Sequence, residues 1–237
     1  MNAIQGTNRL VFEDTLWYFG KLVFLYITLP LTLMWIIIGI SFDLEDTLGA
    51  VSGPSFFFIP FYGAYGYKSL LPIAVGLGST RTQLLKSFYF IALSFTMVFV
   101  LILNILQSIL YLLYDNGISS VNISHLARLF IEDYQFFSYL FIDLGFFLFL
   151  FGISFLGSCI YYRVGMKKMT ISMVAIFIPL TILFYAGILD TPIEWVMGVN
   201  INPVLLFILL GIAGLILLFM AYPIIRNVSL EKKSVRF

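Results

Sequence analysis

Long apolar stretches with very few charges constrain this chain more than any other feature. Six intervals carry at most one charged side chain each, and every one reaches the roughly 20 residues that an α-helix needs to cross a bilayer. They are residues 22–42, 47–67, 87–114, 136–162, 169–189 and 201–225. Charged residues make up only 11% of the chain, against about 25% in a soluble domain. A water-soluble globule and a disordered chain are therefore excluded.

The second interval differs from the others because glycines and prolines interrupt it. Pro54, Pro60, Gly63 and Gly66 all lie between residues 47 and 67. A membrane helix tolerates such residues when neighbouring helices satisfy the freed backbone groups. We therefore keep this interval as a predicted span.

The basic residues are distributed unevenly between the two sets of connections. Twelve of the 13 lie before the first interval, between the second and third, between the fourth and fifth, or after the sixth. Only Arg128 lies in the opposite loops, which instead hold eight of the 12 acidic residues. The positive-inside rule then places both termini in the cytoplasm, which requires an even number of spans. We predict an all-α integral membrane protein with six transmembrane helices.

The chain is expected to form a single transmembrane domain over residues 1–237. Residues 1–21 mix apolar and charged side chains and predict an interfacial helix on the inner leaflet; a cytoplasmic extension of the first helix is the alternative. Residues 22–225 would form the six-helix bundle, and residues 226–237 a cytoplasmic tail. The polar N-terminus does not resemble a cleavable signal peptide.

The connection between the second and third spans, residues 68–86, is the most informative stretch. Its sequence is KSLLPIAVGLGSTRTQLLK. Gly76 and Gly78 favour a turn, and Ser79 or Thr80 is suited to cap a short helix that begins near Arg81. A compact polar helix here suits docking to a cytoplasmic partner. A positive-inside turn without a partner explains the composition equally well.

These features together resemble the permease subunit of an ABC-2-type exporter, in particular the small six-helix permeases of Gram-positive bacteria. The motif LPIAVGLGSTRTQLLKS at residues 71–87 is similar to the segment that forms the coupling helix in that family and docks in a groove of the ATPase. By this resemblance, the ATPase-coupling residues are Gly76, Gly78, Thr80, Arg81, Thr82, Gln83 and Lys86. The last external loop, 190–202, is too short for the re-entrant hairpin of lipid-exporting relatives, which weakens a lipid-flippase assignment.

The resemblance also implies partners and a mechanism. Two permease chains, identical or different, would assemble with two cytoplasmic P-loop ATPases and rock between inward-open and outward-open states. The chain itself has no Gly-x-x-x-x-Gly-Lys-(Ser/Thr) loop, so ATP and Mg²⁺ are expected in the separate ATPase and no cofactor in this chain. A hydrophobic or amphipathic cargo, such as a toxin or antimicrobial peptide, is expected to leave through the bacterial plasma membrane.

Among the polar residues inside the predicted spans, Asp143, Asn104 and Gln107 are the candidates for a function. Asp143 lies about 10 Å below the outer end of the fourth span at 1.5 Å per residue, and Asn104 and Gln107 share one face of the third span at a similar depth. An intramembrane acid is a functional candidate, whereas amides often tie helices together. The three residues are therefore candidates for a substrate pathway or for an interhelical polar contact.

The chain lacks the residues that other classes of function would need. His125 is the only histidine and lies in an external loop, and Asp143 is the only acid within the six intervals. No paired acids or serine–histidine pair is therefore evident, and an enzyme is not expected. The net charge of +1 gives no indication of nucleic-acid binding. A secondary transporter, a channel or an accessory membrane protein without an ATPase partner are the alternatives.

Overall fold

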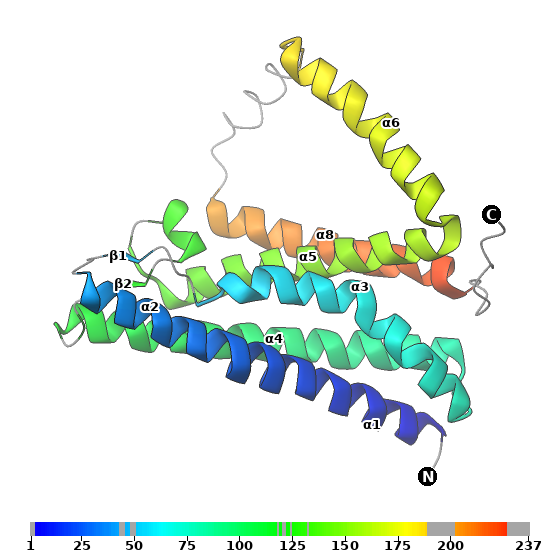
Figure 1. The fold of residues 1–237 in the computed structure, drawn as a ribbon, viewed down its shortest axis with the longest axis horizontal. Coiled ribbons are helices and arrows are strands. Elements are labelled where there is room, and N and C mark those ends of the chain that lie inside the picture. Colours follow the sequence, from blue (N-terminus) through cyan, green and yellow to red (C-terminus); the bar gives the residue numbers. More distant parts are fainter. Residues whose placement is uncertain are drawn as a thin grey trace.

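The computed structural model describes residues 3–42, 46–47, 51–117, 119, 122–123, 125–131, 133–188 and 202–226. These residues are almost entirely helical (Figure 1), which confirms the predicted all-α class. In chain order, the elements are α1 (Ala3–Thr15), η1 (Leu16–Thr28), α2 (Leu29–Ser41), β1 (Asp46–Thr47), α3 (Gly53–Gly76), α4 (Arg81–Asp115), β2 (Asn122–Ile123), η2 (Leu126–Leu129), α5 (Phe136–Val164), α6 (Met166–Tyr185) and α8 (Pro203–Arg226).

Five helices in the described part of the chain are long and apolar enough to cross a membrane. They are Ala3–Ser41, Arg81–Asp115, Phe136–Val164, Met166–Tyr185 and Pro203–Ile225. They contain most or all of the first, third, fourth, fifth and sixth predicted intervals. The remaining interval overlaps α3, which contains Lys68, two internal prolines and several glycines and tyrosines and is therefore less apolar. The helices fit a multi-pass membrane protein.

The N-terminal segment is not a separate interfacial helix, which corrects the prediction for residues 1–21. α1, the π-helical stretch η1 and α2 form one continuous helix of 39 residues, because the junction residues Thr15 and Thr28 both keep right-handed helical dihedrals. At 1.5 Å per residue this helix is about 58 Å long, nearly twice the thickness of the hydrocarbon core. Its first part packs along α4, where Ser87 Oγ donates a hydrogen bond to Asn8 Oδ1.

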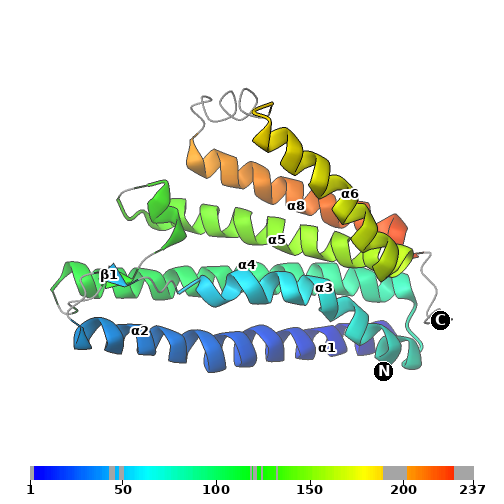
Figure 2. The same ribbon diagram turned by 45° about the horizontal axis from the view of Figure 1, so that its top comes forward.

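The connections gather at two ends of the molecule. β1 and β2 pair in parallel, with Asp46 opposite Asn122, and so join the loops that follow α2 and α4. The start of α1, the α3–α4 turn, the α5–α6 turn and the last turn of α8 lie at the other end (Figures 1 and 2). Each end therefore gathers connections that are far apart in the sequence.

Aromatic side chains from α3, α4 and α5 form the centre of the main core. Phe88 stacks on Phe151 and Phe155, with ring centroids 6.1 and 5.7 Å apart. Tyr62 of α3 also stacks on the Phe88 ring, with centroids 5.6 Å apart. Much of the phenylalanine content therefore packs helix against helix, although Phe57, Phe90 and Phe137 remain exposed.

α5 and α8 pack with their backbones almost in contact. A Cβ atom added to Gly145 would lie 1.9 Å from the carbonyl oxygen of Phe207, and one added to Gly152 would lie 2.2 Å from that of Gly214. Small residues permit this approach, as in many pairs of membrane helices. A Cβ atom added to Gly157, on the same helix, would have no atom within 4 Å. The need for glycine on α5 is therefore specific to positions that contact α8.

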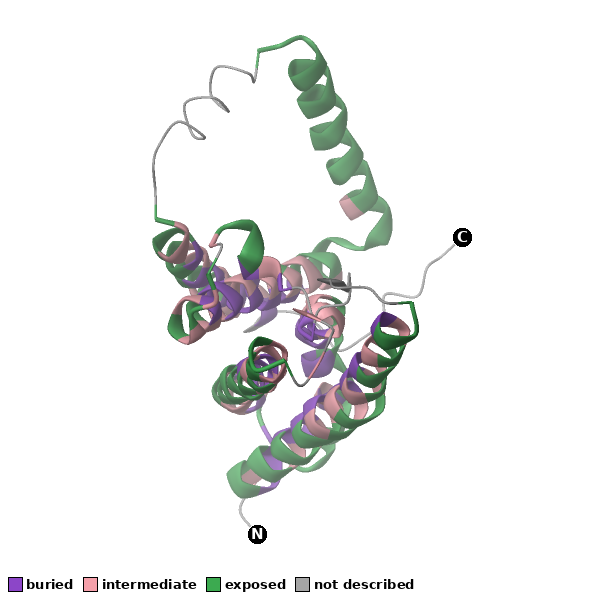
Figure 3. Cartoon of the chain, turned by 90° about the vertical axis from the view of Figure 1, so that its left-hand side faces the viewer, coloured by how far each residue is buried: buried purple, intermediate pink, exposed green. Residues whose placement is uncertain are grey.

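α6 stands apart from the other helices. The chain turns sharply at Gly165, which has a φ of +84°, and α6 then diverges from the bundle (Figure 1). None of its residues is buried, and nearly all of the helix is coloured as exposed in Figure 3. Its apolar side chains have no covering within the described chain.

Candidate functional site: a capped turn and a buried polar cluster

The predicted coupling segment forms a tight turn between α3 and α4. Gly78 adopts a φ of +81°, and its amide donates to the Val75 carbonyl oxygen at 3.0 Å. The Ser79 amide donates to the Ala74 carbonyl oxygen, also at 3.0 Å. These two bonds form a Schellman motif, in which glycine favours the left-handed residue. Backbone hydrogen bonds therefore terminate α3 at this turn.

The start of α4 is stabilised by a capping box. Thr80 Oγ1 accepts a hydrogen bond from the backbone N–H of Gln83 at 3.2 Å, and Gln83 Oε1 accepts one from the backbone N–H of Thr80 at 2.9 Å. Each side chain thus satisfies a backbone donor that the first turn of a helix leaves free. Thr80 is the cap, one of the two residues that the sequence favoured.

The expected short coupling helix does not exist as a separate element, which is a second correction. α3 continues through Pro72 to Gly76, and α4 begins at Arg81 and runs on for 35 residues. The capping box nucleates a helix that no residue then interrupts. The structure still brings all seven predicted residues together at one end of the two helices. Gly76, Gly78, Thr80 and Lys86 are exposed, and Arg81, Thr82 and Gln83 are half-buried.

The second candidate lies near the opposite end of α4, around Asp143. His125 Nε2 lies 3.0 Å from Asp143 Oδ2, and both residues are buried, with exposed fractions of 5% and 1%. The short helix η2 brings this loop residue back onto α5. The sequence placed His125 in an external loop without a partner, whereas the structure makes it the hydrogen-bond partner of the buried acid.

A backbone contact sets the tautomer of His125. Its Nδ1 accepts a hydrogen bond from the Ala127 amide at 3.0 Å, so Nδ1 carries no hydrogen. The neutral ring must then carry its hydrogen on Nε2 and donate it to Asp143. The ring also stacks on Tyr139, with centroids 4.7 Å apart. This geometry holds a neutral imidazole against the carboxylate.

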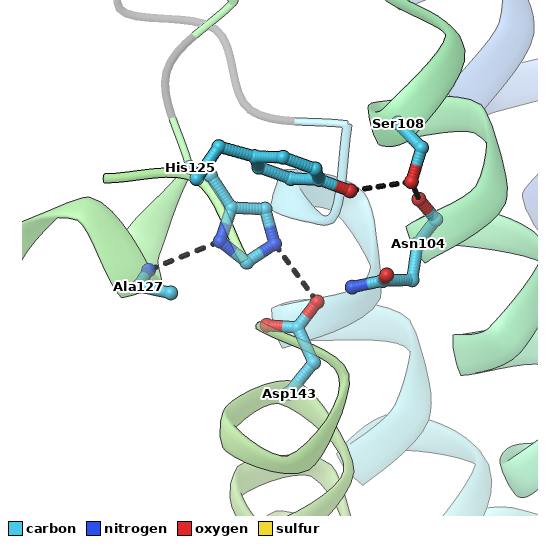
Figure 4. Close-up of polar contacts among 6 residues, drawn as sticks. Asn104, Ser108, His125, Ala127 and Asp143 are labelled. Atoms are coloured by element: carbon cyan, nitrogen blue, oxygen red, sulfur yellow. Dashed lines mark hydrogen bonds and ion pairs between the residues drawn. The ribbon is translucent and has the colours of Figure 1, made fainter. Parts of the chain in front are cut away.

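Asn104 completes the cluster from α4. Its side chain is fully buried and points toward Asp143 (Figure 4), in line with the predicted proximity. Within the described residues, however, neither its Oδ1 nor its Nδ2 has a hydrogen-bond partner, and the same is true of Asp143 Oδ1. Gln107, one turn further along, is buried as well. Asn104 therefore lies near Asp143 without a hydrogen bond to it in the part of the chain that is described.

Tyrosines enclose the cluster on its loop side. Tyr134 contacts Ser108 of α4 through its hydroxyl group and stacks on Tyr111, with centroids 4.4 Å apart. Burial raises the pKa of Tyr134 above its usual value, so its hydroxyl stays protonated at neutral pH. These contacts fasten the loop to α4, while His125 fastens it to α5.

A second acid within the helices escaped the sequence reasoning. Asp14 is half-buried in the long N-terminal helix, and its Oδ2 accepts a hydrogen bond from the Tyr62 hydroxyl at 3.0 Å. The Tyr62 hydroxyl also lies 2.7 Å from Thr15 Oγ1. Assigning residues 1–21 to the membrane surface hid this network, which ties α1 to α3.

An apolar groove accompanies the contact between α5 and α8. It has a volume of about 220 Å³ and is lined by Phe141, Leu144, Gly145, Leu148, Ile208, Gly211, Ile212 and Leu215. These side chains supply no polar atoms, so the groove offers an apolar surface without chemical groups. In the part of the chain that is described, no three His, Cys, Asp or Glu residues are grouped as a metal site would require.

No protein-family model matches the chain, and comparisons with curated proteins and with solved structures gave no match.

Proposed function

We propose that this chain is the membrane-spanning permease subunit of an ATP-driven ABC-2-type exporter. The observation that supports this function best is the α3–α4 turn. Hydrogen bonds within the turn terminate α3 and cap α4, so it keeps its shape while offering exposed Leu77, Thr80 and Lys86 to a partner. This turn also carries the motif that resembles the ATPase-docking segment of the family.

The proposed membrane arrangement has six spans with both termini in the cytoplasm. α3 would supply the second span, because its 24 residues extend about 36 Å at 1.5 Å per residue. Lys68 at its inner half is exposed, and its Nζ lies 4.4 Å from the centre of the Tyr162 ring, a favourable cation–π contact. The end that holds the α3–α4 turn then faces the cytoplasm.

A second permease chain and two soluble P-loop ATPases complete the proposed complex. The apolar surface of α6 suits contact with the second chain or with lipid. ATP and Mg²⁺ would bind to the ATPases, whose closure would push on Arg81 and its neighbours in each permease. Because α4 is one uninterrupted helix, a displacement at the turn would reach Asn104 at its outer half.

The buried cluster is the proposed outer gate. His125 and Tyr134 hold the external loop against α5 and α4. A movement of α4 relative to α5 would separate these contacts and open a path for an amphipathic cargo, such as a toxin or antimicrobial peptide. The gate would close again when His125 returns to Asp143.

Purification of the tagged chain from its native membrane tests this proposal. We expect a soluble protein with a P-loop to co-purify in equal amount, and to hydrolyse ATP faster with the permease than alone. If no ATPase co-purifies under conditions that preserve other membrane complexes, the export function is wrong. Transport driven by an ion gradient would then favour a secondary transporter.

A further inference from the structure

The carboxylate of Asp143 has no positively charged partner among the residues that the structure describes. Its only hydrogen bond there comes from His125, and the Ala127 contact keeps that ring neutral. A buried carboxylate with a single neutral donor is costly, because such charges are normally paired with a cation or a metal. Asp143 Oδ1, in addition, has no hydrogen-bond partner in the described chain, so the site is short of donors.

A second, independent observation points to a missing ligand. Asn104 is fully buried and points toward Asp143 (Figure 4), yet both polar atoms of its amide lack a partner in the described chain. Buried polar atoms are rarely left unsatisfied in native proteins. Asp143 Oδ1 and Asn104 Oδ1 are both acceptors, so a group with several N–H donors would satisfy them together.

We propose that Asp143 and Asn104 bind a protonated primary amine of the transported substrate, such as a lysine side chain or the amino terminus of a peptide. An ammonium group has three donors and no acceptor, so two of its donors would satisfy Asp143 Oδ1 and Asn104 Oδ1, while Asn104 Nδ2, itself a donor, would gain no partner from the amine. Tyr139, Ile142 and Phe207 belong to one apolar cluster, and Tyr139 of this cluster stacks on His125; such a surface suits the carbon atoms beside the amine. That this amine belongs to a transported molecule rests on the proposed export function, whereas the binding site itself is independent of that function.

Charge around the site supports a cationic ligand. The sequence places eight acids and one basic residue, Arg128, in the loops at this end of the helices. Arg128 and Asp133 are both exposed on the loop that carries His125. An excess of acids raises the local concentration of cations. The substrate class is thus an amphipathic molecule with a positively charged amine.

Binding of hexylammonium to the purified full chain in lipid nanodiscs tests the site without an ATPase. At pH 7 we expect hexylammonium to raise the melting temperature in a saturable manner, and hexanol, which has the same chain and no charge, to have no saturable effect. Equal responses to the two molecules would overturn the proposal, since they would show partitioning into lipid.

Two variants localise the response. Asp143→Asn removes the charge but keeps an acceptor for His125, and we expect hexylammonium to bind roughly tenfold more weakly, the effect of losing one charge-assisted hydrogen bond. Asp133→Asn, an exposed acid on the same loop, is the control and should bind as the native protein does. If Asp143→Asn loses its native elution profile, Asn104→Leu replaces it and should also weaken binding.

Competition experiments identify the chemical group that the site binds. We expect a peptide with a free amino terminus to displace hexylammonium, and its acetylated, otherwise uncharged counterpart not to do so. Displacement by sodium alone would assign the site to an inorganic cation and overturn the amine assignment, as would unchanged binding in both variants. Failure to find an ATPase would refute export but would leave these binding results unaffected.

Discussion

The two ends of α4 solve the same problem, the placement of polar groups beside a membrane, in opposite ways. At its N-terminus, Thr80 and Gln83 satisfy each other's backbone amides in an accessible turn. In its C-terminal part, Asn104 is fully buried, and its amide has no partner within the described chain. The polar side chains at the N-terminal end are thus hydrogen-bonded within the turn, whereas the Asn104 side chain is not hydrogen-bonded to any described residue.

This difference indicates two kinds of functional surface. A turn that satisfies its own hydrogen bonds keeps one shape, which suits it to transmit a push from a partner. A buried cluster with unsatisfied atoms gains free energy when a ligand or another conformation satisfies them. Stability should therefore respond to substitution with opposite signs at different positions, and the following changes test that contrast.

The largest expected effect is at His125. His125→Ala leaves the buried Asp143 carboxylate without its donor, and we expect the free energy of unfolding to fall by about 3 kcal/mol. Denaturant titration of the purified protein in detergent measures this change. Leu129→Ala, at a position 76% exposed on the same loop, should have little effect. A loss no greater than that of the control would show that the pair does not hold the loop.

An effect of opposite sign is expected at Asn104. Asn104→Leu has nearly the same shape and removes two unsatisfied polar atoms, so the free energy of unfolding should rise by about 1–2 kcal/mol. The neighbouring Ile105→Leu, at a position 44% exposed, should be neutral in the same titration. Destabilisation by Asn104→Leu would mean that the amide is already satisfied in the ligand-free protein.

The smallest effect is expected at the turn. Thr80→Ala removes the capping side chain, which costs about 1 kcal/mol at a helix N-terminus. Thr82→Ala, two residues further on, removes a hydroxyl group that does not cap the helix and should change stability by less than about 0.5 kcal/mol. Equal losses in thermal unfolding of the two variants would refute the capping role.

The sequence predicted the helices better than their junctions. Hydropathy located the apolar intervals because each exceeds the bilayer thickness, and Gly78 and Thr80 located the α3–α4 turn by their known conformational preferences. The continuity of α1 with α2 was only the alternative prediction, because the mixed apolar and charged side chains of residues 1–21 suggested a surface helix. Packing against α3 and α4 decides the outcome.

Contacts between distant segments were beyond the sequence. Nothing in the spacing of His125 and Asp143 shows that η2 folds the loop back onto α5. A signal was nevertheless present, since the only histidine and an intramembrane acid were both expected near the outer surface. The backbone contact of Gly145 with Phe207 likewise needs the two helices in place before the role of the glycine is visible.

The most direct test of ATPase docking at the α3–α4 turn is charge reversal at Arg81. Arg81→Glu and a control, Lys167→Glu at the exposed α5–α6 turn, are reconstituted in nanodiscs with the co-purified ATPase. We expect both variants to insert and elute normally, the control to keep the permease-dependent rise in ATP hydrolysis, and Arg81→Glu to lose most of it. Full stimulation by Arg81→Glu would contradict docking at this turn.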